Sequence, residues 1–528
     1  MRSSRALRVL RCGPFPGCKS EWLSRRLSRS SSEPLVASKS VTNPTVEANA
    51  TTTPAPQADH RHLGVQQGLF TTSVYSPGST LFLPRGAHIF NKLVSFLRAQ
   101  YSHFGFDEVI TPTIYKRSLW EKSGHWENYS DDMFSVDMKQ SPQNFTDEKY
   151  GLKPMNCPGH CLLFASEPRS FRELPIRYAD FSPLHRNETS GALSGLTRLR
   201  KFHQDDGHIF CRPCQVSEEI SRTLDFINLT YMTLNLGPYR LSLSTRPRDH
   251  FIGTVEEWEN AELALRQALD ASGQTWNVNE GDGAFYGPKI DIILTDSDGK
   301  EHQTATIQLD FQLPKRFDLQ YQSPAAELEQ KGLTTTDPGM LAKQGPVRPV
   351  MIHRAILGSI ERLMALLIEH YNGHWPFWLN PRQVAVITVS SDGPVVDYAH
   401  SALNEIQGGL GTAGASRARA IDRTAFAIDM DGTPRTLKKK ISDAKRKRYS
   451  IIVVVGRDNM KRGKSVTVDF SGISDPRGII RRELRACMPL KTVTIVEQEE
   501  PTSDDLKAVE TTPQTLREIM LCLEREYV

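Results

Sequence analysis

The sequence has no long apolar run, few cysteines and little excess charge of either sign. No stretch reaches the roughly 18 apolar residues that a membrane-spanning helix needs, so we expect no membrane span. Eight cysteines in 528 residues are too few for a disulfide scaffold, which favours a reducing compartment. The net charge of +4 neither requires nor excludes nucleic acid, because the distribution of charge matters more than its sum.

Two familiar signatures are also missing. Cys211 and Cys214 form a single CxxC with Pro213 inside it, and without a second pair we expect neither a zinc knuckle nor a redox site. The glycines of GDGAFYGPKIDIIL, residues 281–294, have the wrong spacing for the dinucleotide fingerprint and for the P-loop. This stretch instead predicts a turn that leads into a strand.

Acidic residues are nearly absent from the N-terminal segment. Glu21 is the only acid before Glu33, while arginines recur among serines and leucines. This composition is typical of a mitochondrial or plastid transit peptide, and the arginines interrupt the apolar core that a secretory signal needs. We therefore predict a presequence and disordered spacer over residues 1–58 and a place in the mitochondrial matrix. A disordered basic tail without an address is the alternative.

From Asp59 the composition becomes that of a globular protein. Residues 88–104 carry apolar side chains at helical spacing, and Gly105 is a stop signal. Residues 106–114 indicate a strand, and Pro112 inside it favours a sheet edge or an interface.

The segment KPMNCPGHCLLF, residues 153–164, places Cys157 and His160 on a turn that enters a helix. A buried and inert cysteine is the usual case at such a position. Cysteine beside Pro-Gly-His is nevertheless an unusual choice for packing alone.

Two later segments have strand patterns. Residues 304–313 alternate, so that Gln308, Asp310 and Gln312 share one face. Residues 350–353 end a strand, and a helix is expected from Ile356 onward that includes Arg362.

Residues 186–210, RNETSGALSGLTRLRKFHQDDGHIF, have two strand-like ends joined by a loop rich in glycine, serine and threonine. Arg198 lies in the loop and Phe202 follows it. Arginine and an aromatic ring suit a ligand that carries phosphate and a base. A solvated basic hairpin is the alternative.

Beyond Pro376 and Pro381, strands alternate with helices, which predicts a small α/β domain with a mainly parallel sheet. Residues 437–449 form a basic helix. Such a run is usually a solvated face, but a concentrated patch also suits phosphate contacts. Its basic residues are Lys438, Lys439, Lys440, Lys445, Arg446, Lys447 and Arg448.

Three segments in this order resemble the signature motifs of class II aminoacyl-tRNA synthetases: residues 106–114, 186–210 and GSIER at 358–362. SGHWENY, MNCPGH, FYGPKID, TIQLDF and HRAILGSIER are similar to the versions found in threonyl-tRNA synthetases, and the match spans about residues 59–470. The resemblance implies an α+β catalytic domain over 59–380, with an antiparallel sheet of six or seven strands flanked by helices. A C-terminal α/β anticodon-binding domain over 381–528 would follow.

The resemblance also implies a reaction and a homodimer built through the first motif. L-threonine and ATP would give threonyl-adenylate and diphosphate. The threonyl group would then pass to the 3′-terminal adenosine of mitochondrial tRNA(Thr), leaving AMP. Fixed cations are needed where charge develops on the phosphates.

By resemblance, Arg186 holds the α-phosphate and Arg362 the γ-phosphate of a bent ATP, and both are catalytic residues. Arg198 is a second candidate on the phosphate side. Glu188 would accept a hydrogen bond from the adenine amino group while Phe202 stacks on the ring. Mg²⁺ is expected with ATP, mostly through phosphates and water.

The zinc ligands implied by resemblance are Cys157, His208 and His353, which no spacing rule would group. Three protein ligands leave the ion an open position. The resemblance implies that threonine binds there through its amino and hydroxyl groups, with Asp206 accepting a hydrogen bond from the hydroxyl.

The remaining candidates lie around these groups. Gln204, Tyr286 and Lys289 are further threonine candidates. Gln308 could serve threonine or ATP and is assigned to ATP. His125 is the candidate catalytic base for transfer to tRNA, since histidine has a suitable pKa. The tRNA candidates are Lys438, Lys439, Lys440, Arg446 and Arg448.

This site would reject valine, because an isostere without the hydroxyl leaves the zinc and Asp206 unsatisfied. Serine lacks only a methyl group, worth about 1–3 kcal/mol, so we expect appreciable seryl-adenylate. Longer relatives carry an N-terminal domain that hydrolyses seryl-tRNA. We expect the short mitochondrial type without that domain, and no rapid hydrolysis of Ser-tRNA by this chain. Asp469 stands where the resemblance leads us to expect a basic residue, so anticodon contacts are not carried over.

Two alternatives remain open. Prolyl and histidyl synthetases share the C-terminal domain but lack the set Cys157, His208 and His353, so a zinc assay separates them. A non-catalytic relative that only binds nucleic acid would be expected to have lost Arg186 or Arg362, and both are present.

Overall fold

The computed structural model describes residues 59–137, 149–295, 301–408, 425–462, 465–475, 477–487 and 506–528. The chain divides after Ala55 into two units, and the predicted presequence and spacer, residues 1–58, lie outside the described residues. Among the described helices, none has the length and apolar character needed to cross a membrane.

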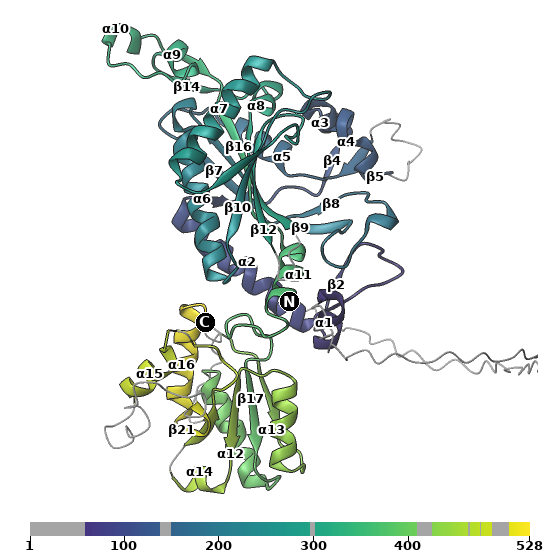
Figure 1. Ribbon diagram of the computed structural model, residues 1–528, viewed down its shortest axis with the longest axis vertical. Helices are drawn as coiled ribbons and strands as arrows, with labels where there is room; N and C mark the ends of the chain where they lie inside the picture. The colour runs from purple at the N-terminus through teal and green to yellow at the C-terminus, as the bar shows by residue number, and fades with distance from the viewer. Residues whose placement is uncertain are drawn as a thin grey trace, which may run out of the picture. The chain divides into compact units, whose positions relative to one another are not determined.

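The main sheet has nine strands, in the order β11-β10-β12-β13-β16-β9-β7-β3, with β8 pairing β9 off this path (Figure 1). Among its described strand pairs, β10–β11 and β3–β7 are parallel and the others antiparallel. The antiparallel prediction is confirmed, although six or seven strands was too few. The bounds are β3 (Asp107–Glu108), β7 (Ile176–Asp180), β8 (Pro183–His185), β9 (Lys201–Cys211), β10 (Tyr239–Ser244), β11 (Trp276–Asn279), β12 (Lys289–Thr295), β13 (Glu301–Asp310) and β16 (Val350–Ser359).

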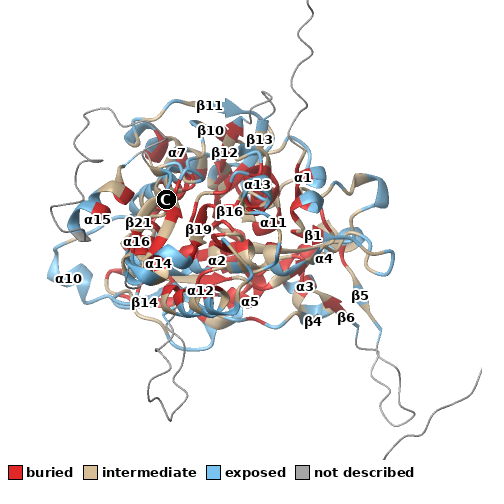
Figure 2. Ribbon diagram, turned by 90° about the horizontal axis from the view of Figure 1, so that it is seen from below, coloured by how far each residue is buried: buried red, intermediate tan, exposed pale blue. Residues whose placement is uncertain are grey.

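Helices cover both faces of this sheet because its strands alternate apolar residues toward each side. Ile209 and Ile352 face the large core that α2, α6, α7 and α11 share, while Phe210 and Met351 face the smaller core around α5. Figure 2 shows the buried residues concentrated in these central strands. The helices are α2 (Pro84–Phe104), α5 (Cys157–Ala165), α6 (Val216–Thr233), α7 (Val255–Ala271) and α11 (Ile360–His370).

Shorter elements surround the sheet, and several have clear start signals. For example, Asp59 caps α1 by accepting from the Arg61 N–H. The short helices are α1 (His60–Gln67), α3 (Arg117–Ser123), α4 (His125–Tyr129), α8 (Gln312–Arg316), α9 (Ala326–Gln330), α10 (Pro338–Leu341), η1 (Ser130–Asp132), η2 (Ser190–Ala192) and η3 (Pro213–Gln215). The small sheets pair β1 (Phe70–Thr71) with β2 (Leu81–Phe82), β14 (Tyr321–Ser323) with β15 (Gly345–Val347), and β6 (Tyr150–Leu152) with β4 (Ile114–Lys116) and β5 (Ser135–Val136).

The strand expected over residues 106–114 is much shorter in the structure. β3 lies at the sheet edge, as the proline indicated, but it ends at Glu108. Beyond Val109 the backbone leaves the sheet, because the Thr111 N–H bonds the Asp180 carboxylate at 3.2 Å and Pro112 has no N–H. Ile114 then starts β4 in another sheet.

The helix expected from Ile356 begins later. β16 continues to Ser359, and its pairing with β9 is irregular between Ala355 and Ser359. Gly358 has φ +61°, which favours glycine. The Ser359 hydroxyl then caps α11 by accepting from the Arg362 N–H at 3.1 Å. The predicted start of this helix was wrong because an apolar strand and an apolar helix have similar patterns over a few residues.

The C-terminal sheet has five strands in the order β18-β17-β19-β20-β21. β17 pairs in parallel with β18 and β19, whereas β19–β20 and β20–β21 are antiparallel, so a mainly parallel sheet was wrong. The link from β19 to β20 is shorter than the dozen or so residues that a parallel crossover needs. Its elements are β17 (Val384–Thr388), α12 (Gly393–Ile406), β18 (Ile428–Asp431), α13 (Leu437–Arg446), β19 (Ile451–Val455), α14 (Arg457–Lys461), β20 (Val466–Asp469), α15 (Ile479–Cys487), β21 (Val509–Thr511) and α16 (Pro513–Arg525).

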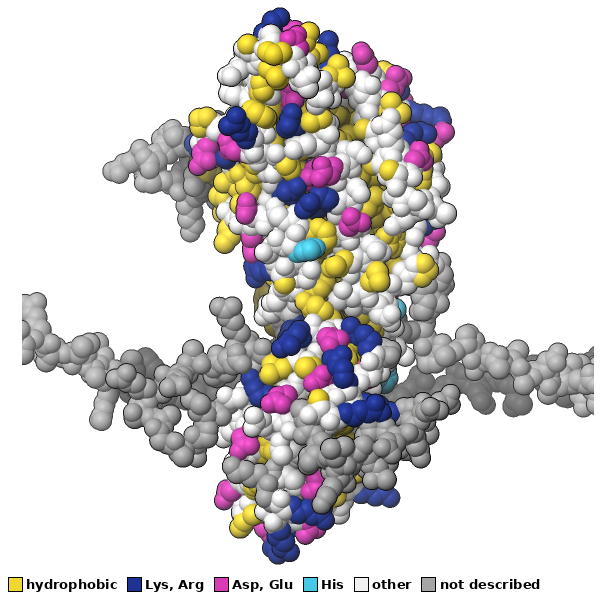
Figure 3. Space-filling view, turned by 90° about the vertical axis from the view of Figure 1, so that its left-hand side faces the viewer, with side chains coloured by type: hydrophobic (Ala, Val, Ile, Leu, Met, Phe, Trp, Pro, Cys, Tyr) yellow, Lys and Arg dark blue, Asp and Glu magenta, His cyan; other side chains and the backbone are white. Residues whose placement is uncertain are grey.

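The predicted boundary between the domains 59–380 and 381–528 falls between α11 and β17. These domain limits stay a prediction. On the molecular face drawn in Figure 3, lysines and arginines are interspersed with aspartates and glutamates. This mixture agrees with the small net charge.

Candidate functional site

Three residues far apart in the sequence meet at the centre of the main sheet. His208 of β9 and His353 of β16 are direct partners in the antiparallel pairing, and Cys157 is the first residue of α5. One ligand atom from each lies within 4.8 Å of the others. All three residues are buried, with 4%, 0% and 7% of Cys157, His208 and His353 exposed. We call these three residues the Cys–His–His cluster.

Hydrogen bonds fix which nitrogen of His353 faces the cluster. Its Nε2 lies 2.8 Å from the Asp310 carboxylate, which can only accept, so Nε2 carries the hydrogen. The Nδ1 lone pair of His353 therefore points toward His208 Nε2, at 3.0 Å.

A second chain of contacts ends on the other side of His208. Its Nδ1 lies 2.7 Å from His160 Nδ1, and His160 Nε2 lies 3.8 Å from Asp180. The Asp180 carboxylate also accepts from the Thr111 hydroxyl at 2.7 Å. If His160 directs its Nε2–H toward Asp180, its Nδ1 accepts from His208 Nδ1–H. His208 then presents a lone pair on Nε2 to the cluster.

This donor set fits a zinc ion. When the Nδ1–H of His208 points to His160 and the Nε2–H of His353 points to Asp310, the lone pairs of His208 Nε2 and His353 Nδ1 face one another at 3.0 Å. Two facing lone pairs repel each other unless a cation lies between them. Tetrahedral zinc with Zn–N distances of about 2.0–2.1 Å would separate the nitrogens by about 3.3 Å, close to this value. Burial raises the pKa of the Cys157 thiol and lowers that of His208. A bound divalent cation would reverse the thiol's preference for its neutral form.

Of the four threonine candidates, Asp206 and Tyr286 lie beside the cluster, whereas Lys289 is held in an ion pair and Gln204 lies apart. Asp206 is buried beside the cluster, with a carboxylate oxygen 3.9 Å from His208 Nε2, and burial raises its pKa. The Tyr286 ring lies 5.2 Å from the His353 ring. Lys289 is already paired, since its ammonium lies 2.8 Å from Asp291. Gln204 lies away from the cluster, on the wall of a second cavity.

A separate cavity of about 250 Å³ lies along the same two central strands. Within it, Arg186 stacks over Phe202 with 5.1 Å between the guanidinium carbon and the ring centre. Arg198 pairs with Glu188 at 2.8 Å. We call this cavity the arginine pocket. Of the residues predicted for any site, six line this pocket: Arg186, Glu188, Arg198, Phe202, Gln204 and Arg362.

The arginine pocket carries excess positive charge. Arg362 is hydrogen-bonded from Nε to the Thr197 carbonyl at 3.2 Å. Burial lowers the pKa of Arg362, and the nearby charges of Arg186 and Arg198 lower it further. Three guanidinium groups against the one carboxylate of Glu188 form a site that suits a polyanion with a ring for Phe202.

The structure separates two glutamines differently from our prediction. Gln308 of β13 is the strand partner of His353 and bonds the Gly287 carbonyl at 3.2 Å, outside the arginine pocket to which we had assigned it. Gln204, predicted for threonine, lines that pocket instead. The position of each therefore argues against its original assignment.

The prediction missed several lining residues of the arginine pocket, among them Gln303 and Thr306 of β13. Thr306 lies two residues before Gln308, so strand alternation could have found it. Gln303 could not be found in this way. Against β12, β13 carries one extra residue between Ala305 and Gln303, which breaks its alternation there.

His125 begins α4 and is 1% exposed. Its Nδ1 lies 2.8 Å from the Ser123 hydroxyl, and its Nε2 has no hydrogen-bond partner among the described residues. Burial lowers the pKa of His125 to about 3, with contributions from His353 and Arg316. The ordinary histidine pKa on which we based its role as a base is therefore not what this position provides.

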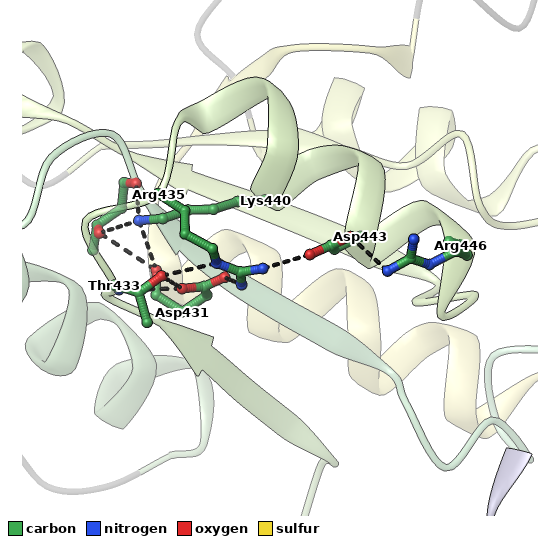
Figure 4. A network of polar contacts seen from close by, with 7 residues as sticks. Asp431, Thr433, Arg435, Lys440, Asp443 and Arg446 are labelled. Atoms are coloured by element: carbon green, nitrogen blue, oxygen red, sulfur yellow. Dashed lines mark hydrogen bonds and ion pairs between the residues drawn. The ribbon is translucent and has the colours of Figure 1, made fainter.

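The basic helix holds one lysine that cannot reach RNA. Lys440 is 1% exposed, and its ammonium donates to the Thr388 carbonyl at 2.9 Å and the Asp431 carbonyl at 3.2 Å (Figure 4). The prediction of Lys440 as a tRNA contact is wrong, because a charge run does not reveal which face of a helix packs inward. Its ammonium instead binds the backbone carbonyls of the last residues of β17 and β18.

The other predicted tRNA contacts differ in availability. Arg446 is exposed but pairs with Asp443 at 2.7 Å, and Arg448 is half-buried with φ +62°. Lys438 and Lys439 are exposed in the first turn of α13. Asp469, which stood out in the sequence, pairs with Lys445 at 2.9 Å.

The comparisons with known proteins agree on one family. Residues 137–337 match the tRNA synthetase class II core domain (G, H, P, S and T), and residues 383–471 match an anticodon binding domain. The probable mitochondrial threonine–tRNA ligase of Schizosaccharomyces pombe is 49% identical over 405 residues, which cover 76% of this chain and 82% of the relative. This chain belongs to the threonine–tRNA ligases.

Other members of the threonine–tRNA ligase family are similar at the same level. The mitochondrial enzyme of Saccharomyces cerevisiae is 48% identical over 410 residues, covering 76% of this chain and 84% of the relative. A crystal structure described as the RNA binding domain of threonyl-tRNA synthetase from Cryptosporidium parvum has a TM-score of 0.68 and 46% identity, and covers 78% of this chain and 92% of that one. A prolyl-tRNA synthetase from Giardia lamblia, at 15% identity, shares the fold.

Proposed function

We propose that this threonine–tRNA ligase activates L-threonine with ATP and transfers it to mitochondrial tRNA(Thr). The observation that carries the proposal is the placement of the Cys–His–His cluster and the arginine pocket on the same strands, β9 and β16. An amino-acid site and a nucleotide site must be adjacent for the adenylate to form. The class II core uses ATP together with Mg²⁺.

In the activation step, a threonine carboxylate oxygen attacks the α-phosphorus. The new carbon–oxygen–phosphorus link forms as the bond to the β-phosphate oxygen breaks, and diphosphate leaves with the electron pair. Arg186 would neutralise charge on the α-phosphate and Arg362 charge on the γ-phosphate. Phe202 would stack on adenine, and Arg198 would exchange its bond with Glu188 for a phosphate.

Cys157, His208 and His353 would hold one zinc ion, which would act as a Lewis acid that binds the amino and hydroxyl groups of threonine. Asp206 would accept a hydrogen bond from the hydroxyl. Gln308 would lie on this side, since it is the strand partner of His353. Tyr286 would line the threonine site beside the His353 ring. Lys289 pairs with Asp291, so it would affect threonine only through that carboxylate.

In the transfer step, a ribose hydroxyl of the terminal adenosine attacks the threonyl carbonyl and AMP leaves. The unpartnered Nε2 of His125 could accept the hydroxyl proton. Since its pKa is only about 3, the neutral ring holds a proton poorly. We therefore expect His125→Ala to slow transfer by no more than about 100-fold, the low end for general base catalysis.

Contacts with tRNA would come from the exposed Lys438 and Lys439. Lysines in the first turn of a helix oppose its dipole, so an anionic partner would stabilise them there. Replacing both with alanine should make the dependence of tRNA affinity on salt concentration less steep, by the amount expected for the loss of about two phosphate contacts. Loss of tRNA binding only on replacing Arg446 would point to the other end of the helix.

Three further proposals concern the whole chain. The Arg-rich segment 1–58 and the mitochondrial relatives support import into the mitochondrial matrix, which a fusion of this segment to a fluorescent protein would test. A homodimer through residues 106–114 would be tested by sedimentation with and without Ile110→Asp, a side chain that is 90% exposed. The limits 59–380 and 381–528 would be tested by limited proteolysis.

The deciding experiment is amino-acid-dependent diphosphate exchange with threonine, serine, valine and proline, before and after zinc removal. We expect exchange with threonine, less with serine and almost none with valine or proline. Exchange with proline alone would overturn the proposal.

A further inference from the structure

His60, the second described residue of the chain, joins two segments that lie more than a hundred residues away in the sequence. It begins α1 and is 5% exposed. Its ring Nδ1 lies 2.7 Å from a carboxylate oxygen of Glu369 in α11. Its Nε2 lies 3.1 Å from the backbone nitrogen of Leu196, in the loop between β8 and β9.

The two partners determine the tautomer of the ring. The Glu369 carboxylate can only accept, and it also accepts the His60 backbone N–H at 3.1 Å, so Nδ1 carries the ring hydrogen. Nε2 then offers a lone pair to the Leu196 N–H. The loop approaches the ring closely at Gly195, which has φ +48° and where a Cβ would lie 2.1 Å from Nε2.

The same loop forms a wall of the arginine pocket. Leu196, Thr197 and Arg198 all line the pocket, and the Thr197 carbonyl accepts from Arg362 Nε at 3.2 Å. Positions 362 and 369 lie about two turns apart on α11 and therefore on one face of it. This helix thus holds the loop at two points, directly through Arg362 and indirectly through Glu369 and His60.

A metal site is the other way to explain this group, since ligand atoms of Asp59, His60 and Glu369 lie within 4.8 Å of one another. The donors, however, are already used. Asp59 accepts from the Arg61 backbone N–H at 2.8 Å and pairs with the Arg61 guanidinium at 2.8 Å. Both ring nitrogens of His60 have their own partners.

We propose that His60 is a positioning residue for ATP. It holds the Leu196–Arg198 segment in the shape that binds the nucleotide, although it touches no substrate itself. The inference rests on the proposed function, because it takes the arginine pocket as the ATP site.

The test compares His60→Asn with His60→Gln in the purified full chain. Asparagine can place its amide nitrogen near Nδ1 and keep the bond to Glu369, but it has no acceptor at Nε2. Glutamine reaches the Nε2 position and can accept from Leu196. For the asparagine variant we expect KM for ATP to rise about 3- to 15-fold, as for one lost hydrogen bond, with KM for threonine unchanged. The glutamine variant should lie nearer to the parent.

Hydrogen exchange of the Leu196 amide, followed by mass spectrometry, measures the tether without any catalysis. The amide should exchange faster in His60→Asn than in the parent. Gln66→Ala, at an exposed position on the same helix, is the matched control and should change neither KM nor exchange.

The outcomes separate the two proposals. Faster Leu196 exchange with a raised KM for ATP supports the tether and its role. An unchanged KM for ATP in an active His60→Asn enzyme overturns the inference. If the parent chain shows no threonine-dependent exchange of diphosphate, the proposed function fails, and unchanged protection of the Leu196 amide would then overturn the tether independently.

Discussion

The Cys–His–His cluster and the arginine pocket share two strands but are built in opposite ways. In the cluster, burial favours a neutral thiol and a neutral imidazole, and His353 has a carboxylate behind it. In the arginine pocket, three guanidinium groups face one carboxylate, and the Arg198 side chain is 55% exposed.

The difference shows two ways of preparing a site for its ligand. Strand pairing fixes His208 and His353 before any substrate arrives, and with zinc bound the cluster would discriminate between side chains that differ by one hydroxyl. The arginine pocket instead holds mutually repelling cations, and an anionic ligand relieves that repulsion. A substitution in the cluster should therefore impair selection of the amino acid, and a substitution in the arginine pocket should impair charge stabilisation during the reaction, each without the other.

Zinc removal should have the largest effect. Without the ion, discrimination between threonine and valine should fall from about 10⁴- to 10⁵-fold toward the level of a simple apolar pocket, because no group then demands the hydroxyl. Diphosphate exchange with each amino acid, measured before chelation and after zinc is restored, checks this. A metal-free enzyme that still rejects valine would contradict it.

Arg362→Ala should come next. The loss of one fixed cation at the phosphates should slow threonine-dependent diphosphate exchange by about 10²- to 10³-fold. Threonine binding, measured by calorimetry in the absence of ATP, should be unchanged. If threonine affinity falls equally, the two halves of the site are not separate.

His160→Ala should weaken zinc binding by about 10- to 100-fold, as expected when the partner of a metal-bound histidine is lost. Competition with a zinc chelator measures the affinity directly. Cys161→Ala is the matched control, since Cys161 lies on the same helix, is fully buried and is outside the cluster. Equal losses in both variants would indicate a packing defect in α5.

The smallest effects should come from the two glutamines. Gln308→Ala should raise KM for threonine and Gln204→Ala should raise KM for ATP, each by about fivefold, as for one neutral hydrogen bond. Steady-state kinetics with each substrate varied in turn would show the pattern. The reverse pattern would restore our original assignments.

The sequence carried different amounts of information about these two regions. Two of the three arginines of the arginine pocket, its glutamate and its aromatic ring come from one stretch, residues 186–202, so its charge and ring could be interpreted locally. The cluster joins His208 and His353 through strand register and Cys157 through the packing of α5 against the sheet, neither of which spacing encodes. Only the resemblance to a family grouped them.

The errors have definite physical causes. An irregular pairing hid Gln303, and β16 continued through residues that pattern alone could not distinguish from a helix. The charge run of α13 did not show that Lys440 packs inward. A pKa near that of free histidine could not be assumed for His125, because its burial depends on the tertiary fold.

The row formed by Gln308, His353, His208 and Tyr178 across four neighbouring strands has a consequence for folding. A slip of one residue in the pairing of β16 would turn His353 to the opposite face of the sheet. Such a misfolded chain would lose one of the three proposed zinc ligands at once. Retention of zinc would therefore act as a quality check on newly made chains, distinguishing correctly aligned sheets from compact but misaligned ones.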